Sequence, residues 1–468
     1  MKHRNAWRTP SLCPLAAGLA IAFAGGLAVA DADARPQSPL LPQRGIMAAP
    51  NYSPPGIRGD IVVTNCDDSG PGSLREAYFN AVDQDTIDLS QLSCSTISLT
   101  TGALTDSGAA TSLTLIGPGK YDLTIDGGNS NRVFVHNGSG YLQMFGLSIT
   151  GGSYSGPYGG GCIYSYGGVL AEYVQISACS LSSGGIDHAY GGAIYAKTGV
   201  FLAEDTISGS TAHAASANSS GGAVFANQAT ILASTISGNT VSGDGSHYSR
   251  GGGLFVLTDV VIGYSTFSDN TAETGGGIFM VGATDTMLVI DSTISGNHSS
   301  GAAGGLYAKY RPLQIANSTI TANTAVFDFG AGAYLASNTD IQSTIIAGNT
   351  SQDGLQASDV GGNAAVTITG SSNLIVASTL PLPADTIDAD PMLGPLQDNG
   401  GLTQTHALLP GSPAIDHGNN PFGLLVEQRL FDDLAPTFGY ERVVGPSADI
   451  GAFEFGAPDH IFVDGFDA

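Results

Sequence analysis

Apolar residues return at a fixed interval along the middle of the chain, inside short runs in which they alternate with Ser and Thr. Between residues 219 and 350 the phrase Ser-Thr-Ile-Ser-Gly-Asn and its variants occur five times, and the apolar residue at the centre of the phrase recurs every 25 to 31 residues. These central residues are Ile236, Phe267, Ile294, Ile320 and Ile345. A fixed period of this length is typical of stacked repeats, because one short unit cannot bury its own apolar face.

The alternation within each unit predicts short strands. It has the two-residue period of a strand, is broken by Gly, Asn and Pro, and shows no apolar stripe at helical spacing. Strands that lie one unit apart and run in the same direction pair in parallel, so that each coil stacks on the last at about 4.8 Å per step. The pattern predicts a right-handed parallel β-helix over residues 86–380, with roughly ten or eleven coils. Leucine-rich and helical repeats have similar periods but need regular Leu spacing or amphipathic helices.

An asparagine follows the apolar centre of each unit by three residues, counting from Ile346 in the last unit. The set consists of Asn239, Asn270, Asn297, Asn323 and Asn349. Asn tolerates the left-handed backbone of a sharp corner, and its amide can donate to one coil while accepting from another. We expect a structural ladder. The Gly pairs that open each unit, such as those at Gly221 and Gly251, are expected at corners that need positive φ or leave no room for a side chain.

Some of the repeats resemble a known family. The sequences GGAI at Gly191, GGAV at Gly221 and FSDN at Phe267 are similar to the repeats of polymorphic outer-membrane proteins, with GGGL and GGGI as departures. The resemblance implies an adhesive protein exposed at a cell surface.

The first 59 residues are not expected to belong to the repeat fold. Residues 1–30 combine a basic start, an apolar run and Ala28-Val29-Ala30 as a cleavage site, which predicts a signal peptide. A membrane anchor is the alternative, and the basic start together with the small-residue end argues against it. Residues 31–59 are rich in Pro and predict an extended linker.

Residues 60–85 predict an N-terminal cap, made of a strand, a Gly/Pro turn and a short helix that Ser73 begins. The run NCDDSGPGSLREA from Asn65 resembles the CSLREA-type module that precedes β-helices in exported bacterial proteins. Such a cap shields the apolar core and the free strand edge of the first coil from water.

After Leu380 the period stops. The runs NGGLTQTHALLPGSPAIDHG from Asn399 and ADIGAFEF from Ala448 resemble the choice-of-anchor Q region found after such β-helices, although Leu430 stands where that family has Gly after its Gln-Arg. We expect residues 381–456 to form a second cap over the last coil. Residues 457–468 resemble a short tail of exported Gram-negative proteins, and no apolar membrane anchor follows them.

The charge balance excludes several partners. The formal net charge is −25, and removal of the signal peptide leaves 12 basic against 40 acidic residues. Nucleic acid and anionic bilayers are therefore not expected as partners, and a polyanionic substrate would be repelled unless a cation intervened. The low charged fraction of 12% and the 66 Gly residues suit a thin β-solenoid with a Ser, Thr and Asn surface.

Four cysteines remain after the signal peptide, and four thiols allow three pairings. Proximity in the sequence favours Cys66 with Cys94 and Cys162 with Cys179. Metal binding is the alternative, but no Cys-x-x-Cys spacing occurs and exported thiols usually oxidise.

Candidate chemistry is confined to the loops before the Gly pairs. Loops at the same position of successive coils lie along one edge of a solenoid. The loops here carry Asp244, His247, Arg250, Asp269 and Glu273. A polysaccharide lyase would hold Ca²⁺ with carboxylates beside an arginine base, for which Arg250 and Arg311 are candidates. A glycoside hydrolase would need two of the carboxylates. The simpler interpretation is that these loops are polar because they are exposed to solvent.

The sequence thus favours a β-helix that is secreted or displayed at the surface of a Gram-negative cell and binds a polysaccharide or another surface ligand. The alternative is a carbohydrate-active enzyme, either a calcium-assisted lyase such as a pectate lyase or a hydrolase. No catalytic residue is assigned, and no cofactor is expected apart from Ca²⁺ in the lyase alternative. Carboxylates converging beside Arg250 or Arg311 would distinguish the enzyme from a flat Ser/Thr/Asn binding face.

Overall fold

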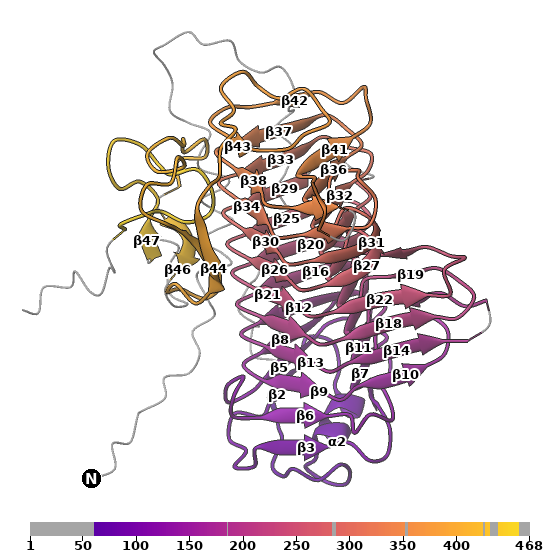
Figure 1. Ribbon diagram of the computed structural model, residues 1–468. Coiled ribbons are helices and arrows are strands. Elements are labelled where there is room, and N and C mark those ends of the chain that lie inside the picture. The colour runs from indigo at the N-terminus through magenta and orange to yellow at the C-terminus, as the bar shows by residue number, and fades with distance from the viewer. Residues whose placement is uncertain are drawn as a thin grey trace, which may run out of the picture.

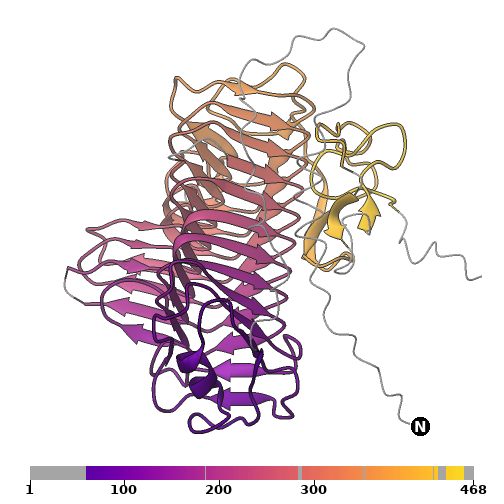
Figure 2. The same ribbon diagram turned by 180° about the vertical axis from the view of Figure 1, so that it is seen from behind.

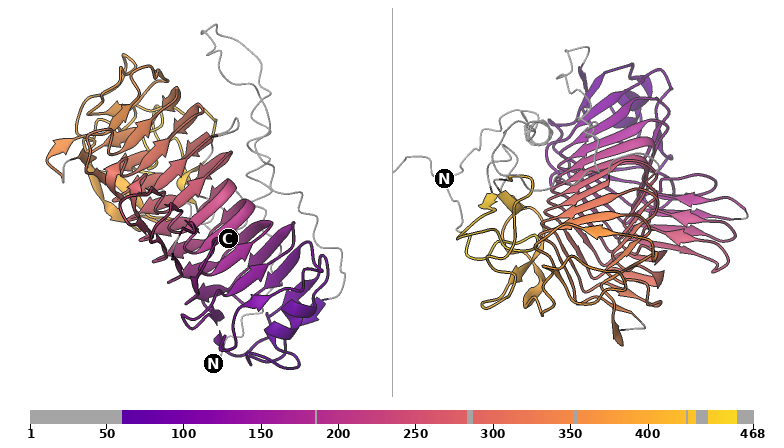
Figure 3. Two further views of the ribbon diagram at one scale, coloured as in Figure 1. Left: turned by 90° about the vertical axis from the view of Figure 1, so that its right-hand side faces the viewer. Right: turned by 90° about the horizontal axis from the view of Figure 1, so that it is seen from above.

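The computed structural model describes residues 60–184, 186–282, 287–351, 354–424, 426–430 and 439–457. The expected signal peptide (1–30), the linker (31–59) and all but the first residue of the tail (457–468) lie outside the described residues. The described part is a rod of stacked coils with a lateral extension on one side and a small C-terminal segment on the other (Figures 1 and 3).

Three parallel sheets run along the rod. Sheet A has 20 strands in the described residues, sheet B has 11 and sheet C has 12. Sheet B receives one strand from each coil, so the described solenoid has 11 coils. The right-handed parallel β-helix that the repeats predict is therefore confirmed.

Sheet A has two arms that meet within the two longest strands, β16 and β20. The strands of the first arm are β4 (Leu104–Thr105), β7 (Phe134–His136), β11 (Ile163–Ser165), β16 (Ile194–Ala203), β20 (Val224–Leu232), β24 (Leu254–Val256), β28 (Ile278–Met280), β32 (Leu306–Ala308), β36 (Ala333–Leu335) and β41 (Val360–Gly362). The other strands of the second arm are β1 (Asp60–Val62), β2 (Thr86–Asp88), β5 (Leu113–Ile116), β8 (Tyr141–Phe145), β12 (Gly168–Glu172), β25 (Val260–Gly263), β29 (Met287–Ile290), β33 (Leu313–Ala316), β37 (Thr339–Gln342) and β42 (Ile368–Thr369).

Sheets B and C complete each coil. Sheet B consists of β3 (Thr96–Ser98), β6 (Thr124–Asp126), β9 (Ser148–Thr150), β13 (Gln175–Ser177), β17 (Thr206–Ser208), β21 (Thr235–Ser237), β26 (Thr266–Ser268), β30 (Thr293–Ser295), β34 (Thr319–Thr321), β38 (Ile345–Ala347) and β43 (Leu374–Ile375). Sheet C consists of β10 (Ser153–Ser155), β14 (Ser180–Ser183), β15 (Ala189–Tyr190), β18 (Thr211–Ala214), β19 (Ser219–Ser220), β22 (Thr240–Gly243), β23 (Ser249–Arg250), β27 (Thr271–Thr274), β31 (His298–Ala302), β35 (Thr324–Ala325), β39 (Thr350–Ser351) and β40 (Gln356–Ala357).

The core is a stack of apolar residues in register from coil to coil. In sheet B the central residue of each strand points inward, and Ile236, Phe267, Ile294 and Ile320 are fully buried one above another. The choice of Ile345 as the last member of this column is wrong, because Ile346 pairs with Ile320. The last phrase, STIIAGN, is one residue longer than its counterparts and shifts the inward position by one.

The five asparagines form a continuous buried ladder at the corner between sheets B and C. Each side-chain carbonyl accepts from the backbone N–H and the amide of the preceding Asn, as Asn297 does from Asn270 at 3.0 and 2.9 Å. Each amide also donates to a backbone carbonyl of the preceding coil, such as Phe267 O at 3.0 Å from Asn297. The last rung is the carboxylate of Asp359, which accepts from Asn349 at 2.9 Å. The sequence analysis did not identify Asp359 as the end of the ladder.

A second ladder runs along the other corner of sheet B and was not predicted. The hydroxyl of one coil accepts from the backbone N–H of the residue one coil earlier. The donor–acceptor steps run from Asp205 through Ser234, Ser265, Ser292 and Ser318 to Thr344. The Ser that opens each of the first four phrases, and Thr344 in the fifth, is therefore structural, because it occupies a buried corner.

The Gly pairs lie at the corner that they were expected to form. Gly221 has a φ of 73°, in the left-handed region, and a Cβ on Gly222 would collide with the carbonyl oxygen of Gly252 in the next coil. Glycine meets both requirements without strain, whereas any other residue would be strained or would clash. These corners bring the chain from sheet C into the first arm of sheet A.

Both cysteine pairings that proximity favoured are present as disulfides. The Cα atoms of Cys66 and Cys94 are 6.5 Å apart, and those of Cys162 and Cys179 are 5.4 Å apart. The metal-binding alternative therefore does not apply to these four sulfurs. Two disulfides are typical of proteins that fold in an oxidising compartment.

The short helix α2 (Leu74–Asn80) lies at the N-terminal end of the rod (Figures 1 and 2). Ser73 is its N-cap and accepts from the backbone N–H of Glu76. Leu74 and Tyr78 are buried, and the ring of Tyr78 packs 5.4 Å from that of Phe134. Arg75 donates to the carbonyl oxygens of Gly102 and Ala103, which fastens the helix to the second coil. No helix in the described part of the chain is both long and apolar enough to cross a membrane.

The C-terminal region does not form a cap over the last coil as a whole. The edge of the last coil is met by residues just after Leu374, since Val360 and Ile375 donate to Ala377 O and Ile387 O. The strands that follow lie against the outer face of sheet B (Figure 1). They are β44 (Leu393–Gln397), β45 (Thr405–Leu408), β46 (Val426–Leu430) and β47 (Gly439–Glu441).

The expected position of the C-terminal region over the last coil is therefore corrected to the flank of the rod. The outward threonines of sheet B explain the docking. Thr266 donates to Gln404 O at 2.6 Å, Thr293 to Gln428 Oε1 at 2.6 Å, and Thr319 accepts from Ala452 N at 3.1 Å. The segment thus spans several coils and buries a row of hydroxyls that would otherwise face water.

Replacing a central rung of the Asn ladder should destabilise the solenoid. In Asn297→Leu the buried N–H groups of Asn270 lose their acceptor, at about 1–3 kcal/mol for each unsatisfied group. Thermal and urea unfolding followed by circular dichroism should show a lower midpoint. Asn131→Leu, at an exposed position, is the matched control. An unchanged midpoint in Asn297→Leu would contradict the structural role of the ladder.

Candidate functional site: an aromatic and cationic hollow

A row of stacked aromatic rings runs along the outer face of the first arm of sheet A. The rings occupy equivalent positions in successive strands and pair in register, because alternation along each strand points the flanking residues inward. The row consists of Tyr164, Tyr195, Phe225, Phe255, Phe279, Tyr307 and Tyr334, with neighbouring centroids 4.7 to 5.5 Å apart and ring planes within 5° to 14° of parallel. The spacing follows the rise of the coils.

This row was not predicted from the sequence, although its signal was present. In the repeats that open with GGAI, GGAV, GGGL, GGGI, GGL and GAGA, the next residue is Tyr or Phe, as in GGAVF and GGGIF. The aliphatic residue faces the core, so the next residue must face outward. A fixed outward position that is always aromatic is a surface feature, since the core does not need it.

The lateral extension of sheet C rises beside the middle of the row. It is built from β14, β18 and β22 together with β15, β19 and β23 (Figures 1 and 3). Tyr190 of the extension stacks on Phe225 with centroids 4.5 Å apart. Phe225, Phe255 and Phe279 are buried, whereas Tyr307 and Tyr334 are half-buried. The row therefore becomes accessible toward its C-terminal end.

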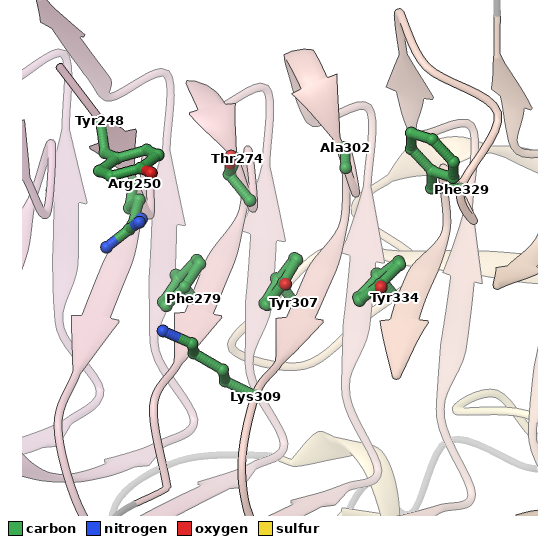
Figure 4. A pocket seen from close by; sticks show the side chains of 9 residues that line it. All are labelled: Tyr248, Arg250, Thr274, Phe279, Ala302, Tyr307, Lys309, Phe329 and Tyr334. Carbon is green, nitrogen blue, oxygen red and sulfur yellow. The ribbon is translucent and has the colours of Figure 1, made fainter. Parts of the chain in front are cut away.

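A hollow of ≈ 280 Å³ lies over that accessible end. It is lined by Tyr248, Arg250, Thr274, Phe279, Ala302, Tyr307, Lys309, Phe329 and Tyr334 (Figure 4). Phe279, Tyr307 and Tyr334 stack on one another and form one side, while Tyr248 and Phe329 lie on the opposite side. The faces of the stacked rings are already in contact, so they offer their edges to the hollow. Tyr248 and Phe329 are 56% and 54% exposed and are the aromatic rings available for stacking.

Two cations line the hollow. The guanidinium of Arg250 lies over the rings of Tyr248 and Phe279, 3.9 and 5.3 Å from their centroids. The amine of Lys309 lies 4.5 Å from the centroid of Tyr310. In the part of the chain that the structure describes, neither cation has a carboxylate within 4.0 Å. Both therefore rest on aromatic rings, and both line the hollow.

The same face carries two more cations that rest on rings. The guanidinium of Arg132 lies 3.4 Å from the centroid of Tyr154, and the amine of Lys197 lies 3.5 Å from that of Tyr166. Arg132 also donates to the carbonyl oxygens of Gly159 and Gly160. Cations and exposed aromatic rings are thus concentrated together on one face of an acidic protein.

The candidate residues from the sequence analysis are distributed around the coils. Arg250 lines the hollow, but the other candidates do not. The carboxylate of Asp244 accepts from His247 Nδ1 at 3.1 Å in the loop between β22 and β23. Glu273, on β27, accepts from the backbone N–H of Ser249 at 3.1 Å. Asp269 precedes β27 at the corner of sheets B and C.

Arg311 lies apart from the lining of the hollow, in the turn between β32 and β33. Among the described residues, no three His, Cys, Asp or Glu side chains are grouped to hold a metal ion. Comparison of the chain with protein-family models, with curated proteins and with solved structures found no match.

A second cluster of charged groups lies between the C-terminal segment and the flank of the rod. Arg429 is paired with Glu427, and Arg442 donates to Asp449 O at 2.7 Å and lies 3.8 Å from Asp291. Burial raises the pKa of Glu427 to about 7 and that of Glu454 to about 8, although the arginines oppose the shift. Burial also raises the pKa values of Asp291 and Asp449. The sequence motifs EQR and ADIGAFEF contain four of these residues. The cluster of charged groups therefore holds the C-terminal segment against the rod.

The raised pKa values predict that the fold loses stability as the pH rises. Unfolded Glu has a pKa near 4.5, so between about pH 5 and 8 the native state holds protons that the unfolded state releases. The stabilisation is complete below pH 4.5 and is lost as the pH passes 7 to 8. Melting temperatures from pH 5 to 9 should fall accordingly. In Glu454→Gln, which cannot titrate, the decline should be smaller. A stability that rises over this range, or an equal decline in the variant, would contradict the account.

Proposed function

We propose that this protein is a secreted or surface-displayed module that binds a glycan in the hollow beside the aromatic row. The observation that carries the proposal is the convergence of aromatic and polar side chains from successive coils on one open hollow. Ligand sites are typically concave and mostly apolar, with a few polar groups that orient the ligand. This hollow has that composition.

Sugar chemistry suits this arrangement. The C–H face of a pyranose ring is apolar and packs on exposed aromatic rings, for which Tyr248 and Phe329 are available. Sugar hydroxyls can pair with the hydroxyls of Tyr307 and Tyr334 and with Thr274. Because the row repeats once per coil, an extended chain can contact several coils at once, and weak contacts add through effective concentration.

The export and surface display of the protein are part of the proposal. The two disulfides favour an oxidising environment, and the sequence signals of residues 1–30 favour a signal peptide. The resemblances to polymorphic outer-membrane proteins, to CSLREA-type modules and to the choice-of-anchor Q region favour a Gram-negative cell surface. Each of these is a sequence signal, and the geometry of the hollow supports binding independently of them.

The enzyme alternative receives less support. Arg250 lies in the hollow, but the carboxylates that were candidates to hold Ca²⁺ or to act as acid and base are engaged elsewhere. Asp244 is paired with His247, and Glu273 with Ser249 N. Arg250 therefore lacks a neighbouring carboxylate pair in the described structure, and binding without turnover is the simpler function.

Loss of the exposed rings should weaken glycan binding. We expect the mature chain to bind at least one polysaccharide in a panel tested by affinity electrophoresis and calorimetry. Tyr248→Ala and Phe329→Ala should each weaken that binding about fivefold, because an aromatic contact contributes about 1 kcal/mol beyond its buried area. Tyr121→Ala removes an exposed ring that does not line the hollow and is the control. Binding that survives both hollow variants, or no binding to any glycan, would contradict the proposal.

The protein should not degrade the glycan that it binds. Incubation with pectate or alginate and Ca²⁺ should give no ultraviolet absorbance from an unsaturated product. A lyase would produce this absorbance, because elimination leaves a double bond in the new sugar end. A calcium-dependent signal that disappears in Arg250→Ala would overturn binding in favour of the lyase alternative.

A further inference from the structure

We infer that the hollow selects an acidic glycan, with a uronate carboxylate held by Arg250 and Lys309. This inference rests on the proposed glycan-binding function and names the class of ligand. It starts from the charge of the lining. Of the nine described residues that line the hollow, two are cationic and none is Asp or Glu. The whole chain, in contrast, has 40 acidic and 15 basic residues.

Among the described residues, no carboxylate pairs with either of the two cations. In a chain with such an excess of carboxylates, a structural Arg or Lys can readily be paired, as Arg429 is with Glu427. Arg250 instead lies between the rings of Tyr248 and Phe279. Rings fix the plane of a guanidinium by cation–π contact without using its N–H donors. The donors of Arg250 therefore remain available to a ligand.

The positions of the two cations bring them to one end of the hollow. The backbone N–H of Lys309 donates to Met280 O at 3.0 Å, which places Lys309 beside the strand of Phe279. Figure 4 shows both groups near Phe279, with the guanidinium of Arg250 to the upper left of the ring and the amine of Lys309 below it. A flat carboxylate can accept two parallel N–H bonds from a guanidinium, and an ammonium adds a point charge. The pair thus forms a subsite for one carboxylate.

Acidic side chains on neighbouring elements bond to other groups and form no ion pair with Arg250 or Lys309 in the described residues. Glu273 is engaged by Ser249 N, and Asp328 accepts from Gln356 Nε2 at 2.7 Å. Asp244 is paired with His247 in the exposed loop. The net charge of the protein opposes a polyanion at long range, where salt screens it, while contacts inside the hollow act at short range. The protein's own Arg and Lys supply the cation that a polyanionic ligand requires.

A uronate fits the hollow better than a densely charged polymer. It combines a planar carboxylate for Arg250 with an apolar ring face for Tyr248 or Phe329. Guanidinium also binds tetrahedral oxyanions with two parallel hydrogen bonds, so the preference for a uronate rests on its apolar ring face and its single charge.

The test compares polygalacturonate with its fully methyl-esterified form, which keeps the backbone and removes the charge. Binding of the mature chain is measured by calorimetry in EDTA, so that no divalent cation bridges the partners. We expect the acid form to bind at least tenfold more tightly than the ester. Arg250→Gln should lower the affinity for the acid form at least tenfold, and Lys309→Gln should lower it as well. Lys197→Gln makes the same charge change on the same face outside the hollow and should have little effect.

The outcomes separate the two proposals. If the acid and ester forms bind with equal affinity, and Arg250→Gln leaves the affinity unchanged, the acidic subsite is overturned while glycan binding stands. Tighter binding of dextran sulfate than of polygalacturonate would overturn the preference for a carboxylate. If Lys197→Gln loses as much affinity as Arg250→Gln, the attraction is a diffuse electrostatic effect of the whole face. This result would contradict the subsite. Absence of binding to every glycan would contradict both the subsite and the proposed function.

Discussion

The hydrogen bonds that join each coil to the next in fixed register are the constraint on which the structure depends. Backbone pairing alone allows neighbouring strands to slip, and a slip of one residue would turn every side chain to the other face. The Asn and Ser ladders prevent this at the two corners of sheet B, because their buried amides and hydroxyls are satisfied in one register only. Every column on the other faces follows from that register.

The functional face is a consequence of the same register. An aromatic residue at one position of each repeat becomes a continuous row only if successive coils stack in phase. Phe279, Tyr307 and Tyr334 meet in this way although they are 27 or 28 residues apart in the sequence. The lateral extension then limits access to the row and leaves the hollow open near Arg250 and Lys309. The fold therefore converts a sequence repeat into a linear surface suited to an extended ligand.

The repeats were sufficient to predict the fold class and the Asn ladder, because these depend on local alternation and on a constant period, and proximity in the sequence was sufficient to predict both disulfides. They were not sufficient where the period varies or the contact is distant. The extra residue in STIIAGN moved the inward position from Ile345 to Ile346. The docking of Gln428 on Thr293 joins residues 135 positions apart, with no periodic signal to connect them. The hollow combines Arg250, which the sequence indicated, with aromatic residues that were not predicted from the sequence.

A crystal structure of the protein with a short oligogalacturonate would test the central claim most directly. The account predicts sugar density beside Phe279, Tyr307 and Tyr334, with one carboxylate within hydrogen-bond distance of the Arg250 guanidinium and the Lys309 amine. Density for the oligosaccharide on another face of the rod, or in the hollow with its carboxylates turned away from both cations, would contradict it.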